Sequence, residues 1–247
     1  MTEVRIGTAG WQLNRQHREQ APGDGSHLQR YARVFDCVEI DSSFYREHQA
    51  KTYARWSQSV PHGFRFSVKL PKTITHEARL VDCGALFARF LEGVGELGDR
   101  LGPLIVQLPP RAAFDPATAE TFFAEVRRQY DGPVACEPRH ASWFDEAANA
   151  LLAAHRIARV AADPVLHPGA DEPGGWRGLI YVRLHGSPET YRSKYGEAAI
   201  AATAEAIAAD PEAGAAWVIF DNTMLGHAFF DALALKTRLG ADEEARR

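Results

Sequence analysis

YVRLHG, residues 181–186, decides what kind of fold this chain forms. Side chains alternate between the two faces of a strand, so Arg183 and His185 share one face while Val182 and Leu184 share the other. A strand covered only on its aliphatic face would leave the guanidinium and the imidazole in water. A strand enclosed on both faces would direct them into an interior, and that interior must then contain groups that receive them.

Short runs rich in β-branched and aromatic residues recur along the whole chain and alternate with stretches of helical periodicity. The predicted strands cover residues 5–10, 37–41, 64–70, 103–108, 133–139, 159–163, 179–186 and 216–222. The predicted helices cover residues 27–35, 51–60, 85–97, 116–130, 144–155, 198–209 and 225–239. Asp115, followed by Pro116, is a favourable N-cap for the fourth of these helices.

Strands that alternate with helices indicate a parallel sheet, and eight such units in 247 residues fit the usual size of a TIM-type (β/α)8 barrel. We therefore predict an α/β fold with a single barrel domain over residues 1–240 and a polar C-terminal tail at residues 241–247. A Gly- and Pro-rich stretch at residues 164–178 replaces the helix after the sixth strand and predicts an irregular connection there. An open, doubly wound sheet is the alternative, but no Gly-x-Gly-x-x-Gly turn follows the first strand.

The charge balance is slightly acidic, with 28 Lys and Arg against 32 Asp and Glu and a net charge of −4. It provides no basic surface, so nucleic acid is allowed but not favoured as a partner. No run of about 18 apolar residues indicates a membrane span, and the first residues lack the pattern of a secretory leader. Three widely spaced cysteines, Cys37, Cys83 and Cys136, form no Cys-x-x-Cys pair. From these observations together we expect a cytoplasmic protein with no membrane contact.

In a barrel both faces of every strand are enclosed, so the polar face of each run must point into the interior, toward its C-terminal end. Alternation places these charged residues there: the carboxylates Glu39, Asp41, Glu137, Asp163 and Asp221, the cations Lys69, Arg139 and Arg183, and the imidazole of His185. Burying a charge costs several kcal/mol unless it is paired, so the cations must meet the carboxylates, a ligand or both. Barrel enzymes place their chemistry at the same strand ends.

Several stretches, in order along nearly the whole chain, resemble the family known as domain of unknown function 72, also called YecE-like. They are GTAGW at 7–11, EIDSSFY at 39–45, KLPKTITH at 69–76, LGPLIVQLPP at 101–110, EPRHASW at 137–143, YVRLHG at 181–186 and FDNT at 220–223. Each motif alone is a weak signal, whereas the ordered set is a strong one. The resemblance implies a TIM-type barrel in the cytoplasm of a bacterium or archaeon, and it carries no established activity.

The chain departs from the usual pattern of this family at a few positions near the motifs. Ala9 stands where Ser is common, Asp41 where Asn is common, and Pro138 replaces a larger residue. Asp221 also stands where the pattern often has Asn. The two additional carboxylates make the expected interior more acidic than is usual for the family.

These inward-facing polar residues, here called the polar column, are interpreted first as a binding site for a small anionic molecule bearing a phosphate or carboxylate. The site would transform this molecule by acid/base chemistry. Glu137 and His185 are the candidate catalytic residues. The candidate substrate-binding residues are Trp11, Glu39, Tyr45, Lys69, His76, Gln107, Arg139, Arg183, Tyr191 and Asp221. Lys69 is expected to bind as a cation rather than react as a nucleophile, because nearby carboxylates would raise its pKa. Hydrolysis, isomerisation and elimination all stay open as the reaction.

Three further interpretations compete with this one. The chain could be a divalent-metal phosphoesterase that acts on nucleotides or nucleic acid, with Glu39, Glu137, Asp163, His185 and Asp221 as the metal ligands. The interspersed cations weigh against a metal site, because they already neutralise carboxylates, and no cofactor is therefore predicted. Alternatively, the protein binds a ligand without catalysis, or the column is an internal salt-bridge network that only fixes the fold.

Overall fold

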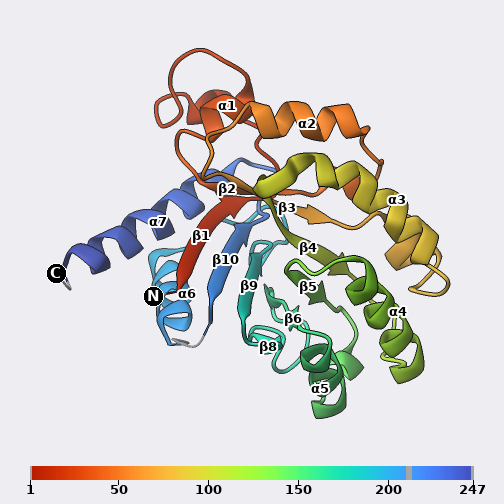
Figure 1. Ribbon diagram of the computed structural model, residues 1–247. Helices are drawn as coiled ribbons and strands as arrows, with labels where there is room; N and C mark the ends of the chain where they lie inside the picture. The colour runs from red at the N-terminus through yellow and green to blue at the C-terminus, as the bar shows by residue number, and fades with distance from the viewer. Residues whose placement is uncertain (1, 210–212, 246–247) are drawn as a thin grey trace.

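The order of strands and helices follows the pattern predicted from the sequence. The computed structural model describes residues 2–209 and 213–245 (Figure 1). Its strands are β1 (Glu3–Thr8), β2 (Cys37–Ile40), β3 (Arg65–Lys69), β4 (Leu101–Gln107), β5 (Val134–Glu137), β6 (Ile157–Arg159), β7 (Ala161–Asp163), β8 (Gly174–Gly175), β9 (Leu179–Leu184) and β10 (Ala215–Phe220). Its α-helices are α1 (His27–Tyr31), α2 (Ala50–Gln58), α3 (Gly84–Val94), α4 (Pro116–Gln129), α5 (Glu146–Ala154), α6 (Glu197–Ala208) and α7 (His227–Ala245). The predicted strands and helices are present in type and place, with ends that differ by a few residues.

The strands form two sheets in which neighbours run parallel, except that the short β8 lies antiparallel to β6. One sheet has the order β1-β10-β9-β7 and the other the order β2-β3-β4-β5-β6-β8. The predicted parallel α/β architecture is therefore confirmed, but the strands are arranged as two sheets rather than as the one continuous ring expected from the sequence. In Figure 1 the helices lie around the outside of the strands and follow one another in chain order.

The two sheets meet at two places. At the first, Ala9, which follows β1, forms an isolated parallel bridge with Glu39 of β2. At the second, the sixth predicted strand divides at Val160, so that β6 pairs with β5 while β7 pairs with β9. A local hydrogen bond contributes to this division, because the Ala162 N–H donates at 2.7 Å to the carbonyl of Ala170 in the loop that follows.

The connection after β7 is irregular, as predicted. Residues 164–178 are all described and contain no helix, and the only regular element in them is β8. At the other end of the chain, α7 continues as far as Ala245, into the stretch that was expected to be a polar tail. Residues 246 and 247 of that tail lie outside the described residues. The predicted boundary at residue 240 therefore falls inside a helix.

The fourth helix begins where the sequence predicted it. The side chain of Asp115 accepts a hydrogen bond from the Thr118 N–H at 2.8 Å, and Pro116 occupies the first helical position. This arrangement satisfies one of the backbone donors that a helix leaves free at its start. Within the described part of the chain, every helix is too short or too polar to cross a bilayer.

The inner face of the strands changes from apolar to polar within one alternation of side chains. The apolar positions, which form a small buried cluster, are Cys37, Ile105, Ala135 and Tyr181. The residues two positions further along the same strands are Glu39, Gln107, Glu137 and Arg183. The opposite faces of the strands pack against the helices in a larger apolar core. A polar layer thus lies on an apolar one, at the C-terminal ends of the strands.

Candidate functional site

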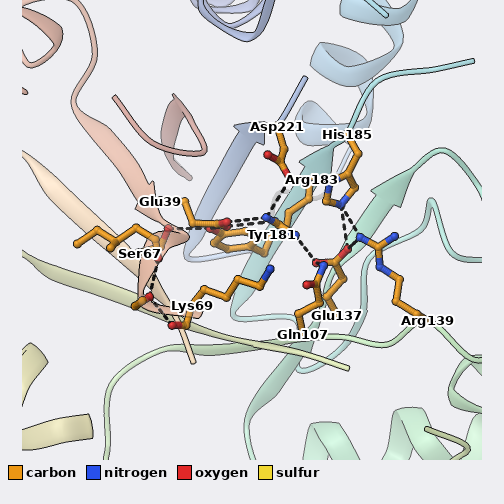
Figure 2. A network of polar contacts seen from close by, with 12 residues as sticks. Glu39, Ser67, Lys69, Gln107, Glu137, Arg139, Tyr181, Arg183, His185 and Asp221 are labelled. Atoms are coloured by element: carbon orange, nitrogen blue, oxygen red, sulfur yellow. Dashed lines mark hydrogen bonds and ion pairs between the residues drawn. The ribbon is translucent and has the colours of Figure 1, made fainter. Parts of the chain in front are cut away.

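Ionisable side chains from several strands converge in the interior of the fold (Figure 2). The buried members of this network, none more than 8% exposed, are Glu39, Lys69, Glu137, Arg183, His185 and Asp221. They come from β2, β3, β5 and β9 and from the residues that directly follow β9 and β10. Both faces of β9 are therefore enclosed, and the polar face of YVRLHG meets partners from other strands.

The Arg183 guanidinium connects three carboxylates. Its Nε and Nη2 donate to Glu39 at 3.1 and 2.6 Å, and its Nη1 donates to Glu137 at 2.5 Å. Nη2 also lies 3.3 Å from Asp221. Burial alone would lower the pKa of Arg183, but the carboxylates of Glu137 and Glu39 raise it well above its usual value. Arg183 therefore serves as the counter-ion of these carboxylates, rather than as the free anion clamp that the sequence suggested.

Glu137 is fixed by four neighbours. Besides Arg183, the Nη2 of Arg139 lies 2.5 Å from its Oε1, and Gln107 donates to its Oε2 at 3.1 Å. His185 Nε2 lies 2.9 Å from Oε1. Although burial on its own raises the pKa of Glu137, the charges of Arg183 and Arg139 hold that pKa well below its usual range. A carboxylate held ionised in this way is a poor proton carrier near neutral pH, so the geometry does not favour the catalytic role suggested for Glu137.

His185 lies between two carboxylates. Its Nδ1 is 2.8 Å from Asp221 Oδ2, and its Nε2 is 2.9 Å from Glu137. The side chain of Asp221 is 12% exposed, whereas that of His185 is fully buried. The ring of Tyr191 lies edge-on to the imidazole, with 5.9 Å between ring centroids. Arg139 Nη2 also lies 2.9 Å from His185 Nε2, so both ring nitrogens are engaged by charged neighbours.

Tyr181 extends the network toward the apolar layer. Its hydroxyl donates to Glu39 Oε2 at 2.9 Å and lies 2.7 Å from the Ser67 hydroxyl. Burial and the charge of Glu39 raise the pKa of Tyr181 well above its usual value. The phenol therefore stays protonated and acts as a fixed donor to the carboxylate.

Replacing Tyr181 with Phe is expected to lower the free energy of unfolding by about 1–3 kcal/mol, because Glu39 and Ser67 would then lose a partner in a buried site. The matched control is Tyr130→Phe, because the Tyr130 hydroxyl makes only a long, weak hydrogen bond of 3.4 Å to the Gly102 carbonyl. Urea denaturation of both variants measures the difference. Equal losses in the two variants would contradict the importance of the Tyr181 hydroxyl.

Two ionisable groups at the rim lack ionic partners. Among the described residues, no carboxylate oxygen lies within 4.0 Å of Lys69 Nζ, which instead sits 4.3 Å from the centroid of the Phe44 ring. Burial and the charge of Arg183 lower the pKa of Lys69 and outweigh the nearby carboxylates, which raise it, so the expected net rise is wrong. Burial and the nearby charge of Glu39 raise the pKa of Asp41 to about 6. The sequence analysis placed Asp41 in the polar column but gave it no role. The absence of Lys and Arg from its motif, EIDSSFY, is a signal that could have indicated an unpaired carboxyl group.

Three further candidate binding residues, Trp11, His76 and Tyr45, differ in burial and in the residues they contact. Trp11 is half-buried and packs edge-on against Trp56 at 4.9 Å. His76 contacts the Thr75 hydroxyl at 2.9 Å and has a pKa lowered by burial and by the charge of Lys69, which places it near that residue. Tyr45, a candidate substrate-binding residue, is 73% exposed and therefore does not line the interior.

Tyr191 takes an unusual backbone conformation above His185. Its φ is 67°, in the left-handed region that non-glycine residues rarely adopt. Its N–H donates to the His185 carbonyl at 2.5 Å, and its own carbonyl accepts from the Met224 N–H at 3.1 Å. Burial and the charge of Asp221 raise the pKa of Tyr191. Tyr191 is 41% exposed, so it lies between the buried imidazole and the solvent.

The five residues suggested as metal ligands do not form one group. Asp163 lies apart from the others, and its carboxylate accepts from the Tyr195 hydroxyl at 2.6 Å. The carboxylates of Glu39 and Glu137 already bind Arg183. In the ranges that the structure describes, no group of three or more His, Cys, Asp or Glu side chains has an arrangement that could hold a metal ion. The site residues thus do not fit the metal-dependent alternative.

Comparison with known proteins places this geometry in a family. The sequence profile of the family described as "Protein of unknown function DUF72" matches residues 5–247. The chain belongs to this family. UPF0759 protein YecE of Escherichia coli (strain K12) is 38% identical over 89 residues, which are 36% of this chain and 32% of YecE. The matched segment thus spans about a third of the length of that relative.

Solved structures of the DUF72 family share the fold. A DUF72 family protein from Thermotoga maritima has a TM-score of 0.77 and 26% identity, covering 96% of this chain and 99% of that one. A DUF72 family protein from Enterococcus faecalis has a TM-score of 0.80 and 22% identity, covering 96% of this chain and 95% of that one. The family predicted from the ordered motifs is therefore confirmed.

Proposed function

We propose that this DUF72 protein binds a small anionic molecule, bearing a phosphate or carboxylate, at the C-terminal ends of its strands and transforms it by proton transfer. The observation that carries the proposal is a buried cation without an ionic partner, Lys69, in the same rim as a carboxyl group, Asp41, that titrates near neutral pH. Proton transfer is the step that hydrolysis, isomerisation and elimination have in common.

We also propose that the two sheets are parts of one TIM-type barrel. Two contacts support this arrangement: the Ala9–Glu39 bridge between β1 and β2, and the continuous chain through Val160 from β6 to β7. In such a barrel the polar layer occupies the C-terminal mouth, which is where barrel enzymes keep their active sites.

The anion would contact Lys69 first. Unlike Arg183, whose donors face carboxylates, Lys69 directs its ammonium group into the polar layer beside Glu137 (Figure 2). Arg139, on the other side of Glu137, offers a second contact, because its buried Nε has no hydrogen-bond partner among the described residues. A buried cation without a counter-ion is costly, and an anionic ligand would offset that cost.

Two groups are suited to carry the proton. Asp41, with a pKa of about 6, exists in both the acid and the carboxylate form near neutral pH, as a general acid or base requires. His185, hydrogen-bonded to Asp221 at the rim, can relay a proton between that carboxylate and the interior. In this proposal Glu137 holds the positions of Arg139 and His185 and does not itself exchange protons.

The proposed partner is a small molecule. No nucleic-acid surface is proposed, because the chain carries a net charge of −4. The proposed setting is the reducing cytoplasm, where the buried thiols of Cys37, Cys83 and Cys136 stay free.

Replacing Lys69 with Met is expected to weaken the binding of inorganic phosphate and acetate by about 10- to 100-fold, the range expected for losing a charged hydrogen bond. Methionine fills a similar volume without a charge, so the fold should be retained. Isothermal titration calorimetry measures the affinities.

The matched control is Lys72→Met in the same segment, where the lysine is 46% exposed and pairs with Glu77 at 3.2 Å. This variant should bind both anions like the unmodified protein. Equal anion affinity in all three proteins, or no detectable binding by the unmodified protein, would overturn the proposal.

A further inference from the structure

A large cavity lies beside the polar network, at the C-terminal ends of β1 and β2. Its volume is about 640 Å³, within the range of sites that hold small ligands. Its buried floor is formed by Thr8, Tyr31 and Ile40, together with Phe229 at the start of α7. Asp41 lines it as well and feels the charges of Asp221 and Lys69, so the cavity adjoins the proposed anion site.

Polar side chains also line the cavity. The exposed side chains of Gln12 and Thr223 line it, and neither makes a hydrogen bond to another residue that the structure describes, so both are free to bind a ligand in place of water. His27 accepts the Leu13 N–H at its Nδ1 at 3.2 Å, which leaves Nε2 as a donor. Neither lysine nor arginine lines the cavity in the described ranges. Its one acidic side chain is Asp41.

The loop above the cavity is already held in place. His17 accepts the Asn14 N–H at 3.0 Å through Nδ1, and its Nε2 lies 3.0 Å from the Gly226 carbonyl. The imidazole stacks on Phe229 with 4.7 Å between centroids. Gln16 donates to the Leu225 carbonyl at 2.8 Å. These contacts tie the loop after β1 to the loop after β10, so a ligand entering the cavity need not order it.

We propose that the cavity holds the uncharged, hydroxyl-bearing body of the substrate, such as a sugar ring, while the anionic group of the same molecule reaches Lys69. This inference rests on the proposed function and adds the class of substrate, a phosphorylated or carboxylated sugar. Hydroxyl groups would pair with the free donors and acceptors of Gln12, His27 and Thr223. An alkyl chain would bury these groups without partners, and a nucleic-acid backbone would find no cation to neutralise it.

Aromatic side chains support a ring-shaped occupant. Trp11, Tyr31 and Phe229 line the cavity, and ligand sites commonly combine such apolar walls with a few polar groups that fix orientation. Asp41 stands where the cavity and the anion site meet. A substrate placed across both would therefore present the bond next to its anionic group to the carboxyl group that titrates near pH 6.

Calorimetry with matched probes tests this inference on the whole chain. Ribose 5-phosphate and glucuronate serve as sugar anions, and inorganic phosphate and acetate serve as small anions. The unmodified protein should bind at least one sugar anion about 10-fold more tightly than the matching small anion. The double variant Gln12→Ala/Thr223→Val should lose that advantage, because each substitution removes a neutral hydrogen bond to the sugar. Its affinity for the small anions should be unchanged.

The outcomes separate the inference from the proposal on which it rests. If sugar anions and small anions bind equally well and Lys69→Met weakens both, the cavity assignment is overturned while the anion site stands. If the double variant keeps the full advantage of the sugar anions, the cavity assignment is likewise overturned. If the unmodified protein binds none of the four probes, both proposals fail.

Discussion

Replacing Arg183 with Met is expected to destabilise the protein by about 3–5 kcal/mol at neutral pH, the loss typical of a broken buried ion pair. The guanidinium donates to Glu39 and Glu137 and lies 3.3 Å from Asp221, so its removal leaves three carboxylates facing one another. These carboxylates are buried, and water cannot replace the lost partner. A loss of this size is a large fraction of the stability of an ordinary domain.

The loss should depend on pH in a direction that identifies its cause. In the unmodified protein the charge of Arg183 helps to hold the pKa of Glu137 well below its usual range, which stabilises the fold above the pKa of the unfolded carboxyl group. Without Arg183 that pKa rises, because only Arg139 and His185 then oppose the effect of burial, so the stability lost relative to the unmodified protein is largest at neutral pH. The variant should therefore recover stability as the pH falls from 7.5 toward 5, which guanidinium chloride denaturation at several pH values measures.

Two further variants make this test specific. Arg139→Met removes a cation that is 15% exposed and pairs with Glu137 alone among the carboxylates, so it should cost less than the loss of Arg183. The double variant Arg183→Met/Glu39→Gln should be more stable than Arg183→Met, because among the described residues Arg183 is the only cation paired with Glu39, whereas Glu137 keeps Arg139. If Arg183→Met does not fold, Glu137→Gln alone still tests the network. An Arg183→Met protein within about 1 kcal/mol of the unmodified one would show that the network does not hold the fold.

Strand alternation predicted which side chains face the interior, because it is a local property of the backbone. Glu39 and Glu137 are each preceded, two positions earlier, by small apolar residues, and the structure places both fully inside. Arg183 and His185 were assigned to the same face in the same way and lie there. Alternation gives a face but not a partner. Whether Arg183 meets carboxylates or a ligand depends on which strands lie across the interior, and residues more than a hundred positions apart decide that.

The failures of the sequence argument have non-local causes. Asp163 has the expected parity, but Tyr195, in the loop after β9, takes up its carboxylate. The lowered pKa of Lys69 reflects the degree of burial and the nearness of Arg183, neither of which the order of residues contains. The raised pKa of Asp41 has the same origin in burial and in its neighbour Glu39. Faces could be predicted, whereas charge states could not.

Replacing Asp41 with Asn is expected to raise the free energy of unfolding by about 2–3 kcal/mol at pH 7.5. Burial, with the charges of Glu39 and Asp221, raises the pKa of Asp41 from 3.8 to about 6 in the folded protein. A rise of that size corresponds to about 3 kcal/mol of disfavoured ionisation. The amide has nearly the same shape and cannot ionise, so the variant avoids this cost.

The sign of the effect follows from which state loses its proton first. Between pH 3.8 and about 6 the unfolded chain ionises Asp41 while the folded protein keeps it protonated, so this residue makes folding less favourable as the pH rises. The full penalty is present above about pH 6. The advantage of Asp41→Asn should therefore shrink as the pH falls from 6 toward 4. Asp24→Asn, at an exposed position, is the matched control and should change stability little at any pH.

Asp41 should also control anion binding through its charge. Above pH 6 a carboxylate at the rim opposes an anion bound at Lys69, so the affinity for sulfate, which does not titrate in this range, should fall as the pH rises from 5 to 7.5. Asp41→Asn should remove most of that fall and bind sulfate more tightly than the unmodified protein at pH 7.5. A sulfate affinity that varies equally with pH in both proteins would separate Asp41 from the anion site. The expected pair of gains in Asp41→Asn would therefore place the ionised carboxylate beside the anion site, which is the position that the proposed acid/base role requires.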